Sequence, residues 1–181
     1  QWNQRAGKRH SQHILPEDYD LPELNDSKKL TEKKREMLFP LIKERAIAWS
    51  VAWVEASEID ATDILSARMK AMQMAIDGLS VTSDMALIDG NRDKGHSAAI
   101  STAHRCIVGG DGKSASIAAA SVLAKVSRDH YVTEVLDKAY PQYQFAKHKG
   151  YGTKLHYEML DKYGPCPEHR RSFLKKWEAK R

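Results

Sequence analysis

Two aspartates stand directly after short apolar segments of the chain, a placement suited to metal chemistry. Asp89 follows residues 85–88 and precedes Gly90, and Asp111 follows residues 106–108 and two glycines. Carboxylates at adjacent strand ends can converge on one point, and hard divalent cations such as Mg²⁺ need oxygen ligands. Two such ions about 4 Å apart can activate a water and stabilise the leaving oxygen of a phosphodiester. The other interpretation is that each aspartate caps a turn, since Asp-Gly is a common turn pair.

Positive charge gathers in the last quarter of the chain. The net charge is +5, and residues 140–181 hold ten Lys/Arg against four Asp/Glu, so this part carries +6 and the rest sums to −1. Such a distribution suggests a surface that faces a polyanion, although basic tails are often merely solvated. Hydrophobic residues make up 41% and charged residues 29%, which is an ordinary soluble balance. No apolar run approaches the roughly 20 residues that a membrane span needs.

The elements that would position the two aspartates follow from periodicity. A helix is expected from Thr31, as its N-cap, to about residue 46, with Pro40 breaking or kinking it. Residues 46–56 alternate in the manner of a half-buried strand. Residues 60–79 space their apolar side chains like an amphipathic helix. Segments 85–88 and 106–108 predict short buried strands that end beside Asp89 and Asp111.

The second half of the chain is predicted to be mainly helical. Residues 114–140 form the longest helical signal, and their many small side chains would let the helix pack close to a sheet. A helix from about residue 154 to 162 follows a glycine loop and stops at Gly164, and a basic final helix is predicted from Ser172. No internal repeat or linker is present, so we expect one mixed α/β domain.

The start of the chain has a different character. Residues 1–13 show neither helical nor strand periodicity and are predicted to be irregular, followed by a strand stub at 13–15 and an acidic loop at 16–22. Cys106 and Cys166 lie far apart and form neither a disulfide framework nor a zinc pattern, so we expect two free thiols in a reducing cytoplasm.

Several segments stand together in the order of a known family. They are NDSKKL at 25–30, LIDGN at 87–91, Gly110-Asp111, SIAAASVLAKVSRD at 116–129, YPQYQFAKHKGYGT at 140–153 and HRRSF at 169–173. This series closely resembles bacterial ribonuclease HII over about residues 14–173. The resemblance implies an α/β, ribonuclease H-like fold, a sheet flanked by helices, with a helical C-terminal part.

The resemblance also implies a metal site. In this family four carboxylates hold Mg²⁺ or Mn²⁺, and the third and fourth match Asp89 and Asp111. Asp129 matches a further recurrent position, and it is either a residue near the metals or a member of an ion pair on the helix surface. We therefore expect Asp89 and Asp111 to be catalytic metal ligands and keep Asp129 as a candidate ligand.

The expected substrate contacts come from the same resemblance. The tyrosine that packs on the sugar at the DNA–RNA junction corresponds to Tyr151, whose alternative is a core position. Ser27, Lys28 and Lys29 match a phosphate-contacting turn, and their alternative is solvated charge. Further substrate-binding candidates are Lys149, Arg128 and Arg170.

The chain departs from the family at its start. The family's opening strand ends in Asp-Glu, which supplies two of the four carboxylates, and a Gly-Arg-Gly turn follows; residues 1–13 contain neither Asp, Glu nor Gly-Arg-Gly. Gly109 also stands where the family usually has lysine. We therefore divide the chain into an irregular, non-family start at 1–13, a ribonuclease HII domain at 14–173 and a basic tail at 174–181. The first strand is expected to be missing or altered, as after a truncation or frame shift.

The function expected from the resemblance is endonucleolytic hydrolysis of RNA in RNA/DNA hybrids, with cuts 5′ to ribonucleotides embedded in DNA, by a two-metal mechanism using Mn²⁺ or Mg²⁺. The alternative is a catalytically impaired, hybrid-binding remnant, since two metal carboxylates are missing. An unrelated small-molecule enzyme is disfavoured because the chain has neither a P-loop nor a Gly-x-Gly-x-x-Gly turn. We expect a cytoplasmic monomer without membrane contact, acting in DNA replication and repair.

Overall fold

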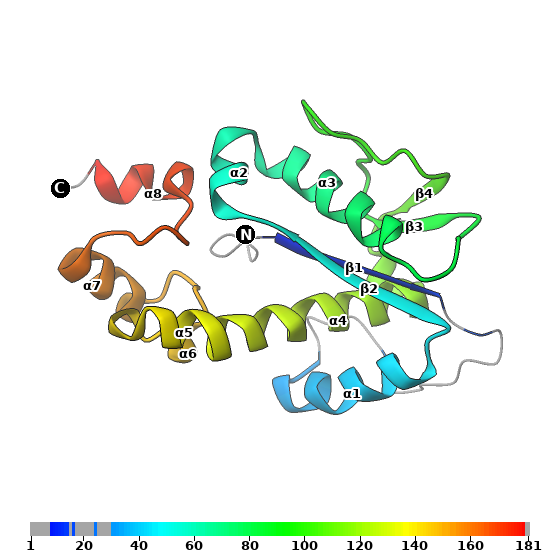
Figure 1. Ribbon diagram of the computed structural model, residues 1–181, viewed down its shortest axis with the longest axis horizontal. Coiled ribbons are helices and arrows are strands. Elements are labelled where there is room, and N and C mark those ends of the chain that lie inside the picture. Colours follow the sequence, from blue (N-terminus) through cyan, green and yellow to red (C-terminus); the bar gives the residue numbers. More distant parts are fainter. Residues whose placement is uncertain (1–7, 15, 17–23, 25–29, 180–181) are drawn as a thin grey trace.

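The computed structural model describes residues 8–14, 16, 24 and 30–179, with the backbone alone for 8–14. The first half of the chain alternates strands and helices (Figure 1). Its elements are β1 (Lys8–Ile14), α1 (Glu32–Arg45), β2 (Ala48–Val54), α2 (Ala56–Ala61), α3 (Ile64–Asp77), β3 (Ala86–Asp89) and β4 (His104–Ile107). The second half is helical, with η1 (Gly110–Gly112), α4 (Ala115–Tyr131), η2 (Val132–Leu136), α5 (Asp137–Ala139), η3 (Pro141–Tyr143), α6 (Phe145–His148), α7 (Lys154–Tyr163) and α8 (Arg171–Glu178).

The strands that the structure describes form two separate pairs. β1 runs antiparallel to β2, with Ile14 opposite Ala48, and β3 runs parallel to β4, with Ile88 opposite Cys106. The mixed α/β class is confirmed, but the single sheet expected from the sequence is here two small ones. The expectation of an irregular start is wrong for residues 8–13, because their backbone pairs with β2 although their side chains lack the usual alternation.

Strand β2 buries the face opposite to the one that its large side chains suggested. Ala48 and Val54 are buried, whereas Trp49 and Trp53 remain 38% and 42% exposed. The Lys43 ammonium lies 4.4 Å from the centre of the Trp49 ring, a cation–π contact at the surface. The small residues face α3, which packs closely on that side of the strand.

Two helices enclose the β1–β2 pair. α3 and α4 both pack against it, on opposite sides in the view of Figure 1, where α4 continues toward α5 along one side of the molecule. The inner faces of these helices carry Met69 and Met72 on α3 and Val122 and Leu123 on α4, all buried. Met69 and Met72 therefore belong to the core, in agreement with the amphipathic spacing of residues 60–79.

Helix α1 begins where the sequence predicted. Thr31 caps it, since its hydroxyl accepts a hydrogen bond from the Lys34 N–H at 3.2 Å, and the helix ends at Arg45. Pro40 lies inside a continuous helix, so the predicted break is wrong. The residues on either side, including buried Leu38 and Ile42, hold the helix against α4, and this packing offsets the lost backbone bond.

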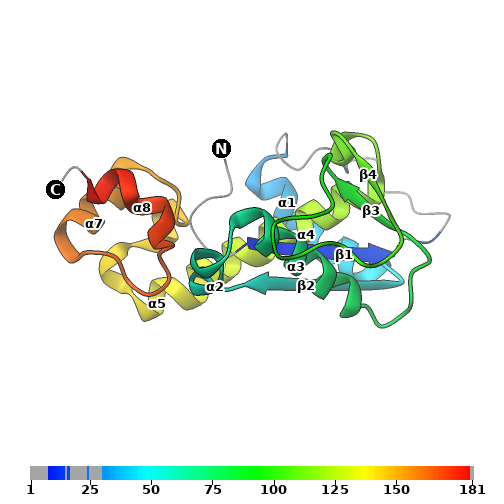
Figure 2. The same cartoon turned by 90° about the horizontal axis from the view of Figure 1, so that it is seen from above.

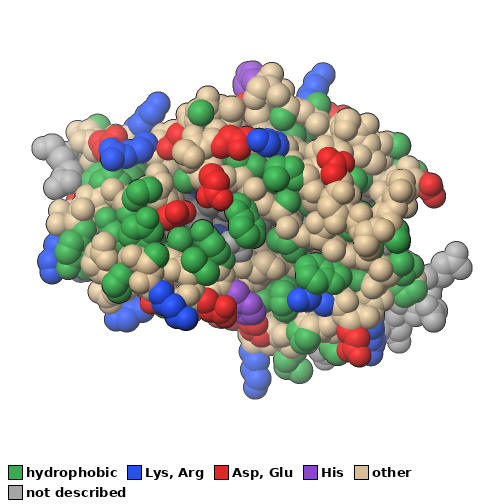
Figure 3. Space-filling model, viewed as in Figure 1, with side chains coloured by type: hydrophobic (Ala, Val, Ile, Leu, Met, Phe, Trp, Pro, Cys, Tyr) green, Lys and Arg blue, Asp and Glu red, His purple; other side chains and the backbone are tan. Residues whose placement is uncertain are grey.

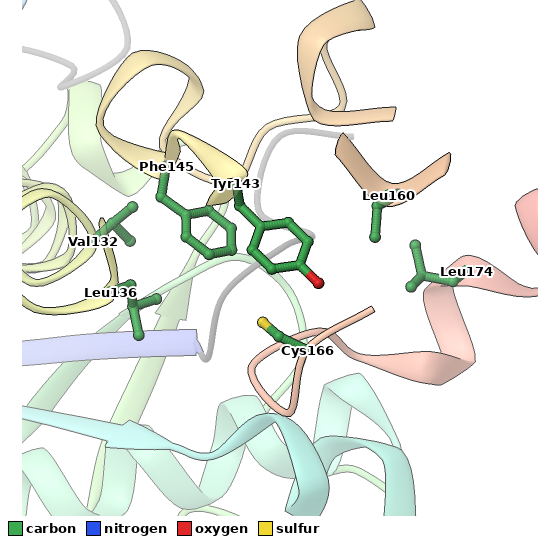
Figure 4. Packing of buried hydrophobic residues seen from close by; sticks show 7 residues of the cluster. All are labelled: Val132, Leu136, Tyr143, Phe145, Leu160, Cys166 and Leu174. Carbon is green, nitrogen blue, oxygen red and sulfur yellow. The ribbon is translucent and has the colours of Figure 1, made fainter. Parts of the chain in front are cut away.

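The long C-terminal helix continues through a five-residue π-type turn. α4 passes at Tyr131 into η2 and then into α5, where the chain leaves the strands. Val132 and Leu136, one at each end of the turn, point into a second core with Tyr143, Phe145, Leu160, Cys166 and Leu174 (Figure 4). This second core holds α5–α8 together at the end of the molecule opposite β3 and β4 (Figure 2).

The predicted final helix is present as α8, although it spans the boundary placed between residues 173 and 174. Both cysteines are free thiols, as expected. No helix in the described part of the chain is long and apolar enough to cross a membrane.

Candidate active site

Asp89 and Asp111 both lie at the C-terminal edge of the β3–β4 pair, and we call these two residues the acidic corner. Asp89 is the last residue of β3, and Asp111 lies in the turn η1 that follows β4. The Asp89 Oδ1 atom accepts a hydrogen bond from the backbone N–H of Gly110 at 2.8 Å. This contact ties the first carboxylate to the residue directly before the second, and the C-terminal ends of the two strands lie side by side.

Backbone geometry fixes the acidic corner. The Gly90 N–H donates to the Ile107 carbonyl at 2.9 Å, which extends the strand pairing past Asp89. Gly109 adopts the left-handed conformation at φ +65°, which starts the turn. A Cβ atom on Gly110 would lie 2.4 Å from Ile117 Cδ1 and 3.4 Å from Asp89 Oδ1. A glycine at position 110 therefore lets the turn before Asp111 lie against Asp89 and Ile117.

The acidic corner suits a hard divalent cation. Asp111 is only 8% exposed, and its side chain and that of Asp89 offer oxygen donors at one edge of the fold. Mg²⁺ is typically held by one or two carboxylates together with waters and substrate phosphates, so two aspartates are a sufficient protein contribution for one ion. The guanidinium of Arg68, on α3, donates to the Asp89 carbonyl at 2.5 Å and steadies the strand end.

Asp129 does not join the acidic corner. It lies 14 residues beyond Ala115 on α4 and therefore about 21 Å along the helix axis from the end that adjoins Asp111. Its carboxylate is buried and pairs with Lys125 at 2.6 Å and with Arg128 at 3.1 Å. The expectation that Asp129 lies near the metals is therefore corrected. Of its two alternatives, the structure contains the ion pair on the helix.

A second cluster surrounds Tyr151, and we call Lys125, Arg128, Lys149 and Tyr151 the Tyr151 site. The Lys125 ammonium donates to the Tyr151 hydroxyl at 2.7 Å, and the Arg128 guanidinium lies 5.1 Å from the centre of the Tyr151 ring. Arg128 also donates to the Lys149 carbonyl at 2.7 Å. One half-buried aromatic ring thus lies against two cations from α4, and Arg128 also ties the loop after α6 to that helix, an arrangement suited to nucleic acid.

Histidines support the backbone of Tyr151. The Tyr151 N–H donates to the His148 carbonyl at 2.8 Å, and His156 Nδ1 donates to the Tyr151 carbonyl at 2.9 Å. The tight turn needs left-handed backbone at Lys149 and Gly150, with φ +48° and +73°. Burial lowers the pKa of His148, and the Gly150 N–H bonds to its Nδ1 at 3.2 Å, so this imidazole is held neutral.

A buried relay of hydrogen bonds extends from Tyr151 into the second core. His156 Nε2 lies 2.9 Å from His169 Nε2, and His169 Nδ1 lies 3.0 Å from the Cys166 sulfur. One assignment of protons satisfies every member, with His169 donating to His156 and the Cys166 thiol donating to His169. Burial raises the pKa of the Cys166 thiol, which keeps it protonated in that role.

The remaining sequence candidates differ in their placement. Lys149 pairs with Glu32, whose pKa it lowers through that hydrogen bond, and so links the Tyr151 loop to α1. Arg170 is 2% exposed and packs 4.1 Å from the centre of the Phe173 ring, so its expected place on the substrate surface is corrected to a structural one. Ser27, Lys28 and Lys29 lie outside the described residues.

Sequence reasoning missed Lys125. Its signal is its spacing, because Lys125 precedes Arg128 by three residues and Asp129 by four, which places all three on neighbouring faces of one helix. Ser121, Lys125 and Arg128 follow one another at spacings of four and three on a half-buried stripe of α4. This stripe runs back toward the end of the helix that adjoins the acidic corner.

The face seen in Figure 3 carries acidic and basic side chains interspersed among apolar patches. The excess positive charge of the C-terminal quarter is therefore not gathered into one basic field on this face. The Tyr151 site, by contrast, brings two cations, Lys125 and Arg128, against one ring, which makes it the stronger candidate for contact with a polyanion.

Comparison with known proteins identifies the family. A family model described as ribonuclease HII matches residues 15–178. The ribonuclease HII of Aliivibrio fischeri (strain MJ11) is 54% identical over 160 residues, which cover 88% of this chain and 75% of the relative. That of Idiomarina loihiensis is 51% identical and covers 88% of this chain and 83% of the relative.

Solved structures agree on the fold. The ribonuclease H2 of Pyrococcus horikoshii OT3 superposes with a TM-score of 0.64 at 23% identity, covering 83% of this chain and 76% of the other. The ribonuclease HII of Archaeoglobus fulgidus, solved in complex with PCNA, gives a TM-score of 0.63 at 21% identity, covering 82% and 76%. Both the fold and the resemblance inferred from the six motifs are thereby confirmed, and the chain belongs to the ribonuclease HII family of endonucleases.

Proposed function

We propose that this chain hydrolyses phosphodiester bonds of RNA in RNA/DNA hybrids, with Mn²⁺ or Mg²⁺ held at the acidic corner. The observation that supports the proposal is the hydrogen bond from the Gly110 N–H to Asp89, which ties the Asp89 carboxylate to the residue directly before Asp111. A bound cation there would supply Lewis-acid activation of water and of the phosphate. The chain's own part is to hold two carboxylates at a fixed separation and to keep Asp89 oriented through the Gly110 N–H.

The Tyr151 site would position the substrate. The Tyr151 ring offers a flat face to the sugar at the DNA–RNA junction, and its hydroxyl is already fixed by Lys125. Lys125 and Arg128 add positive charge beside the ring, which favours the phosphates on either side. Lys125 lies 10 residues beyond the start of α4, about 15 Å along its axis, so one duplex along this helix could reach both sites.

The expected reaction is a cut 5′ to an embedded ribonucleotide, which leaves 5′-phosphate and 3′-hydroxyl ends. The resemblance implies four metal carboxylates, of which the 181 residues hold two, Asp89 and Asp111. A two-metal mechanism depends on the placement of both ions, so we expect these 181 residues alone to cleave very slowly. In the cell, we propose, the protein is a cytoplasmic monomer that removes misincorporated ribonucleotides and primer remnants.

Cleavage of a DNA duplex with one embedded ribonucleotide, in Mn²⁺, tests the proposal. The chain is compared with Asp89→Asn and with Asp84→Asn, a matched change of an exposed carboxylate near the start of the same strand. Cleavage that is lost in Asp89→Asn and kept in Asp84→Asn would establish the acidic corner and overturn the expected impairment. Cleavage unaffected by Asp89→Asn would overturn the assignment of the site.

The second candidate is a hybrid-binding protein with little catalysis. The Tyr151 site favours it, because its cations and ring are assembled independently of the acidic corner. Hybrid affinity that falls steeply with salt, weakens in Tyr151→Ala and does not depend on Mn²⁺ would support it if no cleavage occurs. Affinity unchanged in Tyr151→Ala would rule out this use of the site.

A further inference from the structure

A second group of metal-binding side chains lies on the other face of the β3–β4 pair. Asp93, His104 and Cys106 each present one ligand atom, and these atoms all lie within 4.8 Å of one another. In the part of the chain that the structure describes, no other set of three His, Cys, Asp or Glu residues meets this criterion. Neither Asp89 nor Asp111 belongs to this group.

Strand geometry separates the two sites. His104 and Cys106 are two residues apart on β4, so their side chains share one face of the strand. Cys106 stands opposite Ile88 and shares its side of the pair, where both contact the core that includes Met69 and Ile100. Asp89, the next residue of β3, points to the opposite face, toward Gly110.

The histidine is already oriented as a ligand. His104 Nδ1 donates to the Thr102 carbonyl at 2.6 Å, which leaves Nε2 directed at the Asp93 carboxylate, 3.3 Å away. Metal-binding histidines characteristically fix their second nitrogen on a carbonyl in this way. Two nitrogen or oxygen ligands about 2.1 Å from a tetrahedral ion lie about 3.4 Å apart, close to the observed separation.

The supports of these ligands are themselves anchored. The Gln73 side-chain carbonyl, on α3, accepts from the Ser101 N–H at 2.9 Å, and its amide donates to the Thr102 hydroxyl at 3.0 Å. The Asp93 carbonyl accepts from the Ile100 N–H at 2.9 Å, which closes the loop on which Asp93 lies. The three ligands therefore come from a strand and from a closed loop, and binding an ion would need little rearrangement.

We propose that Asp93, His104 and Cys106 bind a borderline-soft divalent cation of the Zn²⁺ class, with a fourth position open to solvent. A thiolate, an imidazole and a carboxylate select Zn²⁺ over Mg²⁺, which prefers oxygen ligands alone. The ion would clasp the loop after β3 to β4 and replace the contact that now joins Asp93 to His104. It is distinct in ligands and in preferred metal from the cation of the acidic corner.

Titration of the reduced, metal-free chain with Co²⁺ tests the proposal, because thiolate coordination gives a sulfur-to-cobalt charge-transfer band. We expect the charge-transfer band to report one Co²⁺ bound by thiolate per chain, to disappear when Zn²⁺ displaces that ion and to persist in equal Mg²⁺. Cys106→Ser should abolish the band and weaken binding by about a hundredfold or more, since even outer contacts change affinity about 10–100-fold. His96→Gln, which changes an exposed histidine of the same loop, and Asp89→Asn should leave the band unchanged.

A second measurement uses the unaltered chain and does not depend on how the variants fold. Alkylation of Cys106 by iodoacetamide should slow when Zn²⁺ is added and recover with a chelator, while the buried Cys166 serves as the internal reference. A charge-transfer band that persists in Cys106→Ser, or an alkylation rate that Zn²⁺ does not change, would overturn the site.

Discussion

The acidic corner and the Tyr151 site stand toward opposite ends of α4 and are held by different means. The carboxylates of the acidic corner are placed by backbone, through strand pairing, a left-handed Gly109 and the N–H of Gly110. The Tyr151 ring is placed by side chains, through Lys125, Arg128 and the buried histidines beneath its loop. Substitutions that enlarge a residue of the acidic corner should therefore weaken metal binding. Substitutions that remove side-chain atoms from the Tyr151 site should weaken hybrid binding.

The largest expected effect is from Phe145→Ala in the second core. Phe145 is buried, stacks on Tyr143 at 5.4 Å between ring centres and contacts the rings of His148 and His156. Removing a buried phenylalanine costs about 3–5 kcal/mol of unfolding free energy. Chemical denaturation would measure this loss, and hybrid affinity should fall while Mn²⁺ affinity at the acidic corner persists.

Val135→Ala is the control for that change, since Val135 lies on the exposed side of η2 near the same core. It should lower the unfolding free energy by less than about 0.5 kcal/mol. Equal losses in Mn²⁺ and hybrid affinity in Phe145→Ala would show that the two sites are not separately supported.

Gly110→Ala should act on the acidic corner. The added methyl would meet Ile117 Cδ1 and approach Asp89 Oδ1, and overpacking of this kind costs about 1–3 kcal/mol. The Ile117 side chain can rotate, so we expect the lower end for stability, with a clear drop in Mn²⁺ affinity measured by calorimetry. Gly112→Ala, where no atom lies within 4 Å of the added carbon, is the matched control and should leave that affinity unchanged.

Tyr151→Phe sharpens the comparison on the other side. It keeps the ring and removes the hydroxyl that Lys125 contacts at 2.7 Å, so we expect hybrid binding to weaken by about 0.5–1.5 kcal/mol. Fluorescence anisotropy with a labelled hybrid would measure it, with Tyr163→Phe, an exposed tyrosine on α7, as control. A loss as large as that of Tyr151→Ala would show that the hydroxyl, not the ring, carries the contact.

The smallest effect should come from pH through His148. Burial lowers its pKa, while hydrogen bonding to the Tyr143 carbonyl opposes that shift. The unfolded chain takes up the proton near the ordinary value of 6.5, where the folded chain does not, so stability is full above this pH and falls below it. Unfolding free energies between about pH 8 and about pH 5 should show this slope. The slope should flatten in His148→Gln, and an unchanged slope would exclude His148.

The sequence predicted the elements and the acidic corner because both depend on local signals. Neighbouring residues alone predict the helix start at Thr31, the two Asp-Gly turns and the helix end at Gly164. The side of β2 that faces the core could not be read this way. Trp49 and Trp53 lie on the opposite face because α3 packs on the side of β2 that carries its small residues, and that is a property of the packed helix.

Long-range contacts explain the other misses. β1 lacks alternation, and its strand conformation comes from pairing with β2, about 40 residues later in the chain. Arg170 resembles a surface cation in sequence, but its burial depends on Phe173 and on the packing of the C-terminal helices. Lys125 gains its role from Tyr151, which lies 26 residues away.

The π-type turn at η2 sets the rotational phase between the two halves of the protein. An α-helix advances about 100° per residue, so the wider turn moves every later side chain around the axis relative to α4. Upstream of the turn Lys125 and Arg128 face the Tyr151 loop, and downstream Leu136 faces the second core. A deletion of one residue between Val132 and Leu136 would restore a plain helix and turn the C-terminal helices out of phase with the cations that meet them.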